Sequence, residues 1–216
     1  MNSKWIVSLA IGALAAWPAT AQQEKKDEKP PVDAPKNEPL KLGSTVAETV
    51  ALKDLDGKAT SFKELRGKVV IIHFWSDRCP AEKHADPVVK KLEDYYKGKD
   101  VVIVAIASNQ GELGAEPAKD ADYSKCYSNL RSKAKEVGYT HKIFADHGNK
   151  LSALFQAKST PHCFVLDAKG VVAYAGALDD DLNEEKGDKA VVYVRDAADA
   201  LLAGKEVAVK ETRAYG

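Results

Sequence analysis

Two largely apolar runs dominate the hydropathy pattern of the chain. Val69–Trp75 and Val101–Ala107 are rich in β-branched residues, which is typical of strands buried on both faces of a parallel sheet. Between them, from Cys79-Pro80 onward, apolar residues recur at helical spacing, and proline is tolerated in a first helical turn. The expected apolar stripe of this helix is Ala81, Ala85, Val88, Leu92 and Tyr95, with a kink at Pro87.

Shorter elements are predicted on either side of this β-α-β unit. Before it, a strand from Val50 enters an Asp56-Gly57 turn, and 59–62 returns from the turn. The elements after it are, in chain order, a long loop over 108–122, a helix over 123–137, a strand at 143–145, a helix at 150–156, a hairpin with strands 163–167 and 171–174, and a helix over 190–203 with Val191, Val194, Ala198, Leu201 and Leu202 inward. This alternation predicts an α/β fold with a central mixed sheet flanked by helices.

The first 21 residues have the pattern of a secretory signal peptide. Lys4 supplies the positive start, Trp5–Trp17 is apolar apart from one Ser and one Gly, and Ala19-Thr20-Ala21 is a cleavage site. A transmembrane helix needs roughly 20 apolar residues, so an uncleaved anchor is the weaker alternative. We expect cleavage after Ala21, a periplasmic or secreted protein, and no stable membrane insertion after cleavage.

A polar segment, residues 22–42, separates the signal peptide from the folded part. It contains four of the nine prolines and ten charged residues of both signs. Such a composition has nothing to bury and predicts a disordered or extended linker. The folded domain is therefore expected to cover residues 43–216.

Composition narrows the classes of function. The 32 basic residues equal the 32 acidic ones, so the chain lacks the basic excess of a nucleic-acid binder. Three cysteines are too few for a disulfide scaffold, and an odd number leaves at least one thiol without an intramolecular partner. Export would place these thiols where disulfides persist. Thiol chemistry is therefore the first candidate activity.

Three stretches, taken in order, resemble the thioredoxin-like redoxin family, which contains thiol-disulfide reductases and the alkyl hydroperoxide reductase/thiol-specific antioxidant proteins. They are 55–58 (LDGK) with 62–68 (FKELRGK), then 74–80 (FWSDRCP), then 160–161 (TP) with 164–170 (FVLDAKG). The middle stretch resembles the active-site W-C-x-x-C-P, and the last resembles the cis-proline loop and its hairpin. The resemblance covers about residues 43 to 205. It implies a thioredoxin-like three-layer sandwich, and we expect no cofactor.

The motif departs from the family pattern at one position. Ser76 stands where the reductases have their attacking cysteine, and Cys79 stands at the second position. Such a motif cannot close an internal disulfide in one step. S-x-x-C is similar to the T-x-x-C of peroxiredoxins, although Ile72 replaces the proline of that pattern and the Thr160-Pro161 pair is a thioredoxin feature. Disulfide exchange and peroxide reduction therefore both remain open.

Cys79 is the candidate reactive thiol. At a helix N-terminus the helix dipole and unpaired N–H groups favour a thiolate. Arg78 adds a positive charge, and the Ser76 hydroxyl could donate a hydrogen bond to the sulfur. We therefore expect Cys79, Ser76 and Arg78 to form the catalytic group. The alternative is an inert cysteine left from a lost C-x-x-C.

The resemblance also implies a substrate surface. A cis Pro161 would present the Thr160 backbone to an incoming extended chain, next to Trp75. Cys126, on the expected apolar stripe of the 123–137 helix, and Cys163, at the strand after Pro161, are possible resolving cysteines. Buried free cysteines are common, so both are more often core residues. Pairing among the three cysteines stays open.

Two other classes of function remain as alternatives. His84 and His162 could join Cys79 as weak ligand candidates for copper or zinc, although we expect no metal; the acidic run at 179–185 is expected to be a solvated loop. The leading hypothesis is an exported thiol-dependent oxidoreductase that uses Cys79 on a thiol or disulfide protein partner, or on peroxide. The alternatives are a non-catalytic binding module for a client protein and a copper-binding metallochaperone-like protein.

Overall fold

The computed structural model describes residues 38–216. The expected signal peptide and most of the expected linker lie outside these residues. Leu40 packs against the hydrophobic core, and its N–H donates to the carbonyl of Leu154 at 2.8 Å. The folded domain therefore begins before residue 43, the boundary expected from the sequence. None of the helices within 38–216 is long and apolar enough to cross a membrane.

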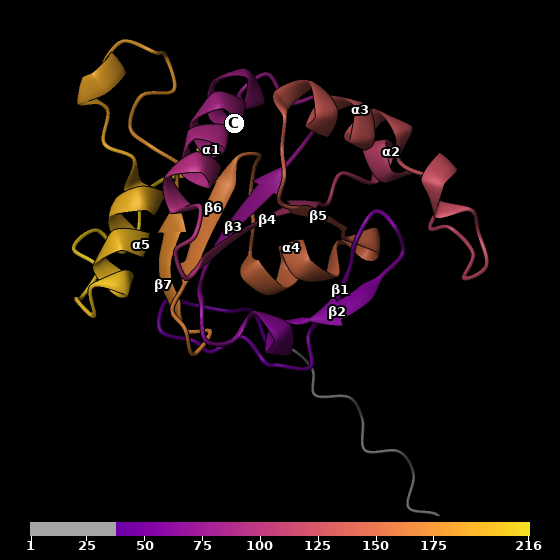
Figure 1. Cartoon of the computed structure of the whole chain (residues 1–216), viewed down its shortest axis with the longest axis horizontal. Coiled ribbons are helices and arrows are strands. Elements are labelled where there is room, and N and C mark those ends of the chain that lie inside the picture. The colour runs from indigo at the N-terminus through magenta and orange to yellow at the C-terminus, as the bar shows by residue number, and fades with distance from the viewer. Residues whose placement is uncertain (1–37) are drawn as a thin grey trace, which may run out of the picture. The chain divides into compact units, whose positions relative to one another are not determined.

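A five-stranded mixed sheet forms the centre of the fold (Figure 1). Its strands, in spatial order, are β5 (Lys142–Ala145), β4 (Val101–Ala107), β3 (Val69–Trp75), β6 (His162–Leu166) and β7 (Val172–Gly176). The strands β5, β4 and β3 are parallel, whereas β6 and β7 run antiparallel to their neighbours. The expected mixed sheet is confirmed, and the two apolar runs form β3 and β4 with the predicted bounds. A separate hairpin pairs β1 (Ala51–Lys53) with β2 (Ala59–Ser61).

Helices cover both faces of the sheet. They are α1 (Glu82–Tyr96), α2 (Gln110–Leu113), α3 (Ser128–Val137), α4 (Lys150–Phe155) and α5 (Tyr193–Leu202), with 3-10 turns η1 (Phe62–Leu65), η2 (Tyr123–Lys125), η3 (His147–Asn149) and η4 (Gly187–Lys189). Alternate residues of a strand face opposite sides. Val69 and Ile71 of β3 accordingly pack with α1 and α5, while Ile72 and Phe74 pack with α4 and the hairpin. The result is three layers, with the sheet in the middle.

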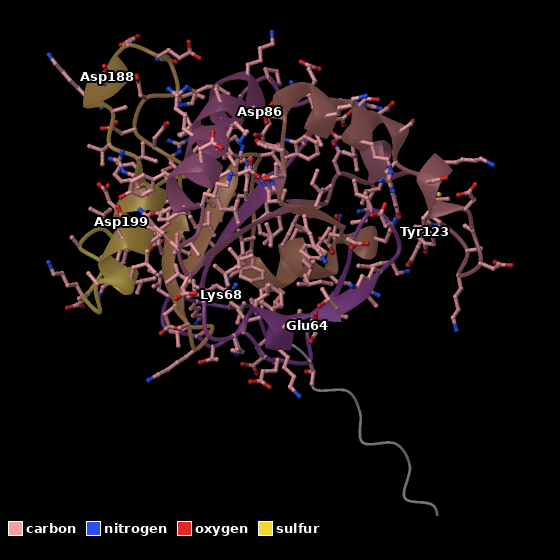
Figure 2. All side chains as sticks on the ribbon, in the orientation of Figure 1. Glu64, Lys68, Asp86, Tyr123, Asp188 and Asp199 are labelled. Carbon is pink, nitrogen blue, oxygen red and sulfur yellow. The ribbon has the colours of Figure 1, made fainter. Side chains whose placement is uncertain are left out.

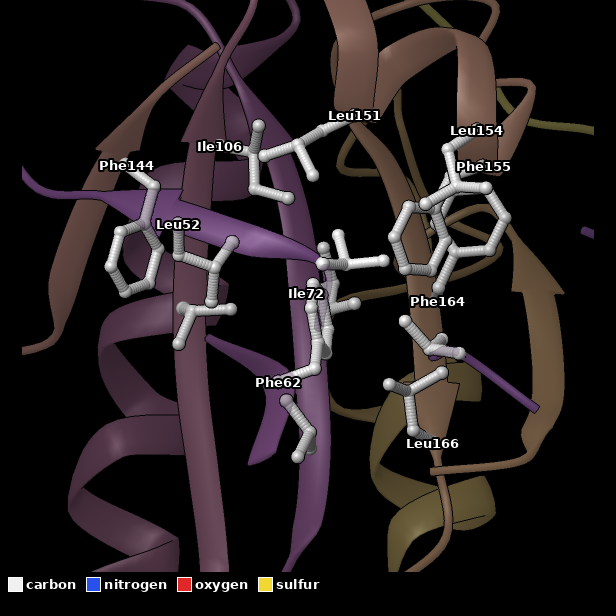
Figure 3. Packing of buried hydrophobic residues seen from close by; sticks show 14 of the residues in the cluster. Leu52, Phe62, Ile72, Ile106, Phe144, Leu151, Leu154, Phe155, Phe164 and Leu166 are labelled. Carbon is white, nitrogen blue, oxygen red and sulfur yellow. The ribbon is translucent and has the colours of Figure 1, made fainter. Parts of the chain in front are cut away.

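The α4 side of the sheet holds an aromatic core (Figure 3). Phe155 of α4 lies with ring centroids 5.1 Å from Phe164, 5.9 Å from Phe74 and 5.9 Å from Phe62. Each such side chain contributes about 1.5–3 kcal/mol when fully buried. This packing fixes β6, and with it the loop that precedes β6.

The first helix departs from its expected start and stripe. It begins at Glu82 rather than Cys79, because residues 79–81 form a turn that leads into it. Val89 and Tyr96 are buried, whereas the expected Tyr95 is 46 % exposed. The helix also buries three polar residues, Glu82, His84 and Asp86. Their partners elsewhere in the fold rotate the buried face away from the apolar stripe.

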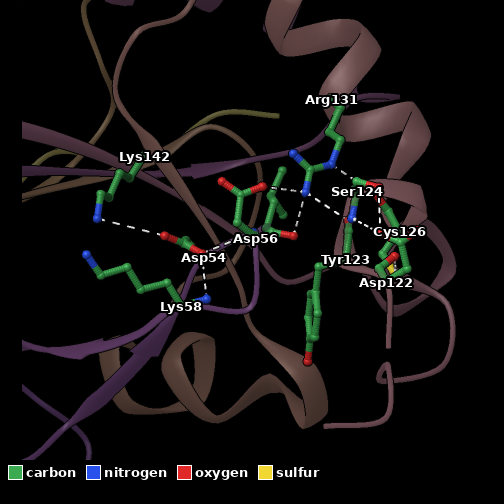
Figure 4. A network of polar contacts seen from close by, with 10 residues as sticks. Asp54, Asp56, Lys58, Asp122, Tyr123, Ser124, Cys126, Arg131 and Lys142 are labelled. Atoms are coloured by element: carbon green, nitrogen blue, oxygen red, sulfur yellow. Dashed lines mark hydrogen bonds and ion pairs between the residues drawn. The ribbon is translucent and has the colours of Figure 1, made fainter. Parts of the chain in front are cut away.

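The helix expected over 123–137 is broken, and the expected loop over 108–122 contains α2. Tyr127, between η2 and α3, has a left-handed backbone with φ 57°. The Arg131 side chain donates to the carbonyls of Cys126 and Tyr123 and also to the carbonyl of Leu55 in the β1–β2 turn (Figure 4). The break therefore ties α3 to the hairpin.

The last helix is shorter than expected, and the surface is densely charged. The α5 helix starts at Tyr193 and buries Val194, Ala197 and Ala198, while the expected inward residues Val191 and Leu202 are 40 % and 39 % exposed. Acidic and basic side chains point outward around the fold (Figure 2). No single sign dominates, in keeping with the balanced composition.

Candidate functional site

The turn between β3 and α1 brings Cys79 against the loop before β6. Cys79 is partly exposed, and its carbonyl accepts a hydrogen bond from the Glu82 N–H at 3.1 Å. Its Sγ lies 2.8 Å from the carbonyl oxygen of Thr160. The Thr160–Pro161 peptide bond is cis. Because β3 and β6 are paired neighbours, with Phe74 opposite His162, both segments leave the sheet at the same edge.

The contact with Thr160 suits a protonated thiol. A thiol can donate a hydrogen bond to a carbonyl, whereas a thiolate has no proton to donate and would face the oxygen lone pairs. Attack by Cys79 on another molecule therefore requires Sγ to leave this carbonyl.

The Ser76 hydroxyl does not donate a hydrogen bond to Cys79 Sγ. The side chain is 3 % exposed, and its hydroxyl donates to Oε1 of Glu112 at 2.5 Å. The hydroxyl oxygen of Ser76 also accepts hydrogen bonds from the backbone N–H groups of Arg78 at 3.2 Å and Cys79 at 3.1 Å. The expected hydrogen bond from Ser76 to a Cys79 thiolate is therefore wrong for this arrangement, because the single hydroxyl proton is already used. Ser76 instead caps the turn that carries Cys79.

Glu112 of α2 is a site residue that the sequence did not reveal. It is 7 % exposed, and its second oxygen accepts from the N–H of Asp77 at 3.2 Å, while Asn109 donates to Oε1 at 2.8 Å. Burial raises the pKa of Glu112, although the Ser76 hydroxyl opposes the shift. The available signal was Asn109 followed three residues later by Glu112 at the end of a strand, a pattern of helix starts.

A buried contact between a carboxyl group and an imidazole lies at the start of α1. Glu82 is 1 % exposed, and its Oε2 lies 3.0 Å from Nε2 of His73, which is fully buried in β3. Burial raises the pKa of Glu82, and the neighbouring His73 opposes that shift. Glu82 therefore occupies, one turn after Cys79, a position that is closed to solvent.

Trp75 and Arg78 differ in burial. Trp75 is fully buried, and its indole N–H donates to Asp86 of α1 at 3.0 Å, so the expected contact of Trp75 with a substrate is not available in this structure. Asp86 also accepts from the Tyr139 hydroxyl at 2.8 Å. Arg78 is exposed beside Cys79. Of these two candidates, only Arg78 can meet an incoming molecule.

The other two cysteines lie in different surroundings. All three are free thiols. Cys163 is 0 % exposed in β6, and burial raises its pKa well above the usual range. Cys126 is half-buried and lies in the break before α3, not on a helical stripe as expected, with Sγ 3.6 Å from the Asp122 carbonyl (Figure 4). Neither is paired with Cys79.

The weak metal candidates have other partners. Nε2 of His84 lies 2.7 Å from Oδ2 of Asp179. Nδ1 of His162 accepts from the Lys158 N–H at 3.2 Å, and burial lowers the pKa of His162 to about 4. In the part of the chain that the structure describes, no group of three or more His, Cys, Asp or Glu residues could hold a metal ion. Cys79, His84 and His162 thus form no such centre.

The acidic run is only partly the solvated loop that its charge predicted. Asp179 and Asp181 are buried, at 2 % and 6 % exposure. Asp181 accepts hydrogen bonds from three backbone N–H groups, those of Glu185, Lys186 and Gly187. The carboxylate of Asp181 folds the loop onto itself, while Asp179 faces α1.

Known proteins resemble this chain in sequence. A thiol-disulfide oxidoreductase ResA of Bacillus cereus is 26 % identical over 136 residues, which are 62 % of this chain and 69 % of the relative. The thiol-disulfide oxidoreductase YkuV of Bacillus subtilis is 28 % identical over 116 residues, 54 % of this chain and 71 % of that protein.

Solved structures of other proteins share the fold of this chain. An uncharacterized conserved protein of Geobacillus kaustophilus is 27 % identical with a TM-score of 0.65, covering 80 % of this chain and 87 % of that one. A hypothetical protein of Sinorhizobium meliloti, 24 % identical, has a TM-score of 0.64 and covers 82 % and 94 %. The fold is thioredoxin-like, as the resemblance implied. Residues 41–192 match the redoxin family. The chain belongs to the redoxin family.

Proposed function

We propose that this protein is an exported thiol oxidoreductase that acts through Cys79 alone and forms mixed disulfides with protein partners. The observation that carries the proposal is the position of Cys79, which is partly exposed in the turn before α1 and lies 2.8 Å from the carbonyl that precedes the cis proline. The family and its thiol-disulfide oxidoreductase relatives support the redox chemistry.

Exposure assigns the roles within the turn. An attacking thiol must be accessible, and its partner in a C-x-x-C pair lies one turn later. Ser76 is 3 % exposed and faces Glu112, so it does not occupy an attacking position. Cys79 is accessible, and three residues later the buried position holds Glu82. We therefore assign the attacking position to Cys79 and the partner position to Glu82, three residues along from the register suggested by the sequence.

The reaction follows from this single thiol. The Cys79 thiolate attacks one sulfur of a partner disulfide, a new S–S bond forms, and the other partner sulfur leaves as a thiolate that takes a proton from water. Exposed Arg78 is placed to favour the developing thiolates. Since Glu82 is no thiol, a second external thiol must resolve the mixed disulfide. In that step the external thiol forms an S–S bond to the partner sulfur and Cys79 leaves as a thiolate, so the exchange ends with one disulfide, as it began.

Peptide mapping after exposure to oxidised glutathione tests the proposal. The purified protein should gain one glutathione, located on Cys79, and lose it to added dithiothreitol. A matched Cys126→Ser variant should behave like the parent, because Cys126 lies outside the turn. Glutathione that attaches to Cys126 while Cys79 stays free in a folded protein would contradict the proposal.

A parallel sample treated with one equivalent of peroxide separates the two oxidants. Oxidation of Cys79 that outpaces its reaction with oxidised glutathione would replace disulfide exchange by peroxide reduction as the activity. A Cys79 that is inert to both, in a protein that still binds an unfolded client, would favour a non-catalytic binding module.

Export is the part of the proposal that rests on the sequence pattern of residues 1–21. Mass spectrometry of protein recovered from a periplasmic or culture-medium fraction tests it. A mature N-terminus at Gln22 is expected, and an intact Met1 in the cytoplasmic fraction would contradict it.

A further inference from the structure

The segment after α5 adds itself to the edge of the sheet. Residues 210–212 run alongside β7, with a parallel bridge between Glu211 and Ala175. The Ala175 N–H donates to the Lys210 carbonyl at 3.0 Å, and the Thr212 N–H donates to the Ala175 carbonyl at 3.2 Å. From this anchored stretch the chain continues toward the loop before β6.

Thr212 fixes the point where the segment leaves β7. Its Oγ1 lies 2.6 Å from the Tyr174 hydroxyl and accepts from the Ala177 N–H at 2.9 Å. A Cβ on Gly176 would lie 2.2 Å from the same oxygen. Only a glycine lets the segment lie this close to β7, so the path of residues 213–216 is set by the fold.

Tyr215 docks in a defined socket. Its hydroxyl donates to Oδ1 of Asp179 at 2.7 Å, and the other oxygen of that carboxylate lies 2.7 Å from Nε2 of His84. Asp179 is 2 % exposed. The Tyr215 carbonyl accepts from the Ser159 hydroxyl at 3.4 Å. The segment is thus held at both its side chain and its backbone.

Gly216 lies directly on the carbonyl that Cys79 contacts. A Cβ at Gly216 would be 2.0 Å from the Thr160 oxygen and 3.3 Å from the Pro161 nitrogen. The same Thr160 oxygen lies 2.8 Å from Cys79 Sγ. Backbone of the segment therefore covers the peptide group beside the reactive thiol.

We propose that Arg213–Gly216 occupies the surface on which an extended protein partner binds, and that the segment shows which partner fits. The partner is an extended peptide with a tyrosine whose hydroxyl reaches Asp179, followed by a small residue on the Thr160 peptide group. Binding of that peptide displaces the segment and takes its place on the Thr160 peptide group beside Cys79. That a protein partner of Cys79 binds there rests on the proposed function, whereas the position of the segment on the Thr160 peptide group does not.

Alkylation of Cys79 by iodoacetamide, quantified by peptide mapping, tests the covering. Tyr215→Phe should raise the rate about ten-fold, the factor that corresponds to loss of one hydrogen bond to a charged group. Tyr95→Phe is the matched control, because the Tyr95 hydroxyl donates to Asp199 at 3.0 Å, away from Thr160. Cys126 in the same sample serves as an internal reference.

Gly216→Val provides a second, independent variant. Its side chain has no room against Thr160 and should lift the segment, whereas Gly204→Val, also at a positive φ but in open space, should leave the rate unchanged. Urea midpoints and circular dichroism establish that each variant is folded. Equal Cys79 rates in the parent, Tyr215→Phe and Gly216→Val, all folded, would overturn the proposal.

Peptide competition tests the partner class. Acetyl-Thr-Arg-Ala-Tyr-Gly should slow Cys79 alkylation in Gly216→Val, and acetyl-Thr-Arg-Ala-Ala-Gly should not. Equal effects of the two peptides would overturn the tyrosine preference. Alkylation needs no redox turnover, so a protein without disulfide exchange could still show the covering, and the two failures are distinguishable.

Discussion

Cys79 and Cys163 lie on paired neighbouring segments yet have opposite surroundings. Cys79 follows the end of β3, is partly exposed and contacts the Thr160 carbonyl. Cys163 lies inside β6, opposite His73, and is 0 % exposed. Burial disfavours a charged thiolate, which is why the pKa of Cys163 is raised. Whether a thiol lies beyond the strand end or within the strand therefore decides which of the two can react.

The largest expected effect comes from replacing Cys79 and Cys163 by serine, one at a time. Cys79→Ser should abolish the mixed disulfide with oxidised glutathione completely, because the accessible thiol is gone. Cys163→Ser should keep it, since that thiol is closed to solvent. Intact mass spectrometry measures both. A mixed disulfide that survives in folded Cys79→Ser and disappears in Cys163→Ser would reverse the comparison.

A second cysteine near Cys79 tests which position of the turn can form a disulfide with it. Glu82→Cys places a thiol one turn after Cys79 and should close an internal disulfide, so that thiol titration after mild oxidation loses two thiols per chain. Ser76→Cys should not, because position 76 faces Glu112. Non-reducing peptide mapping checks the pairing. An internal disulfide to Cys79 in the Ser76→Cys variant, with none in Glu82→Cys, would show that the assigned register is wrong.

His162 lies between the exposed loop and buried Cys163. Its pKa therefore tests how strongly burial acts at the first residue of β6. Its pKa is about 4 in the folded protein against an ordinary 6.5. Between pH 6.5 and pH 4, His162 binds a proton in the unfolded chain but stays neutral in the folded protein. The free energy of unfolding therefore falls as the pH drops from 6.5 to 4. The loss amounts to roughly 3 kcal/mol.

Urea unfolding at several pH values measures this loss. His162→Gln should flatten the pH dependence within that window, while exposed Lys169→Gln should leave it unchanged. An identical slope in the parent and His162→Gln would contradict the assignment.

Ser76→Ala should produce a smaller loss of stability. It removes the hydroxyl that donates to buried Glu112 and accepts from two backbone N–H groups. The expected cost is about 1–3 kcal/mol in urea unfolding. Ser76→Thr, which keeps the hydroxyl, is the control. A Ser76→Ala variant as stable as the parent would mean that the turn does not depend on this cap.

The strands of the central sheet were the most predictable part of the fold. Apart from His73, Val69–Trp75 and Val101–Ala107 are apolar on both faces, so no exposed face had to be predicted. The faces of α1 were less predictable, because Glu82, His84 and Asp86 are buried against His73, Asp179 and Trp75 respectively. Hydropathy cannot show that a polar residue finds a buried partner on another element of the fold.

The sequence predicted Cys79 as the candidate thiol but did not predict its surroundings. Trp75, Thr160 and Pro161 were expected to form a substrate surface, and the structure brings Cys79 to Thr160. Glu112 lies in a stretch that was expected to be a loop, and its contact with Ser76 spans 36 residues of sequence. No glycine or proline marks the break at Tyr127 in the sequence. The break accompanies the hydrogen bonds of Arg131 to distant carbonyls. Such long-range polar contacts leave no local periodicity.

The strand-like stretch 210–212 has a consequence for solubility. An outer strand normally offers unpaired N–H and C=O groups to which a strand of another molecule can add. In β7, Ala175 uses both of its backbone groups on residues 210 and 212 of its own chain. These two hydrogen bonds keep the backbone of Ala175, on this outer strand, from pairing with a second copy of the chain.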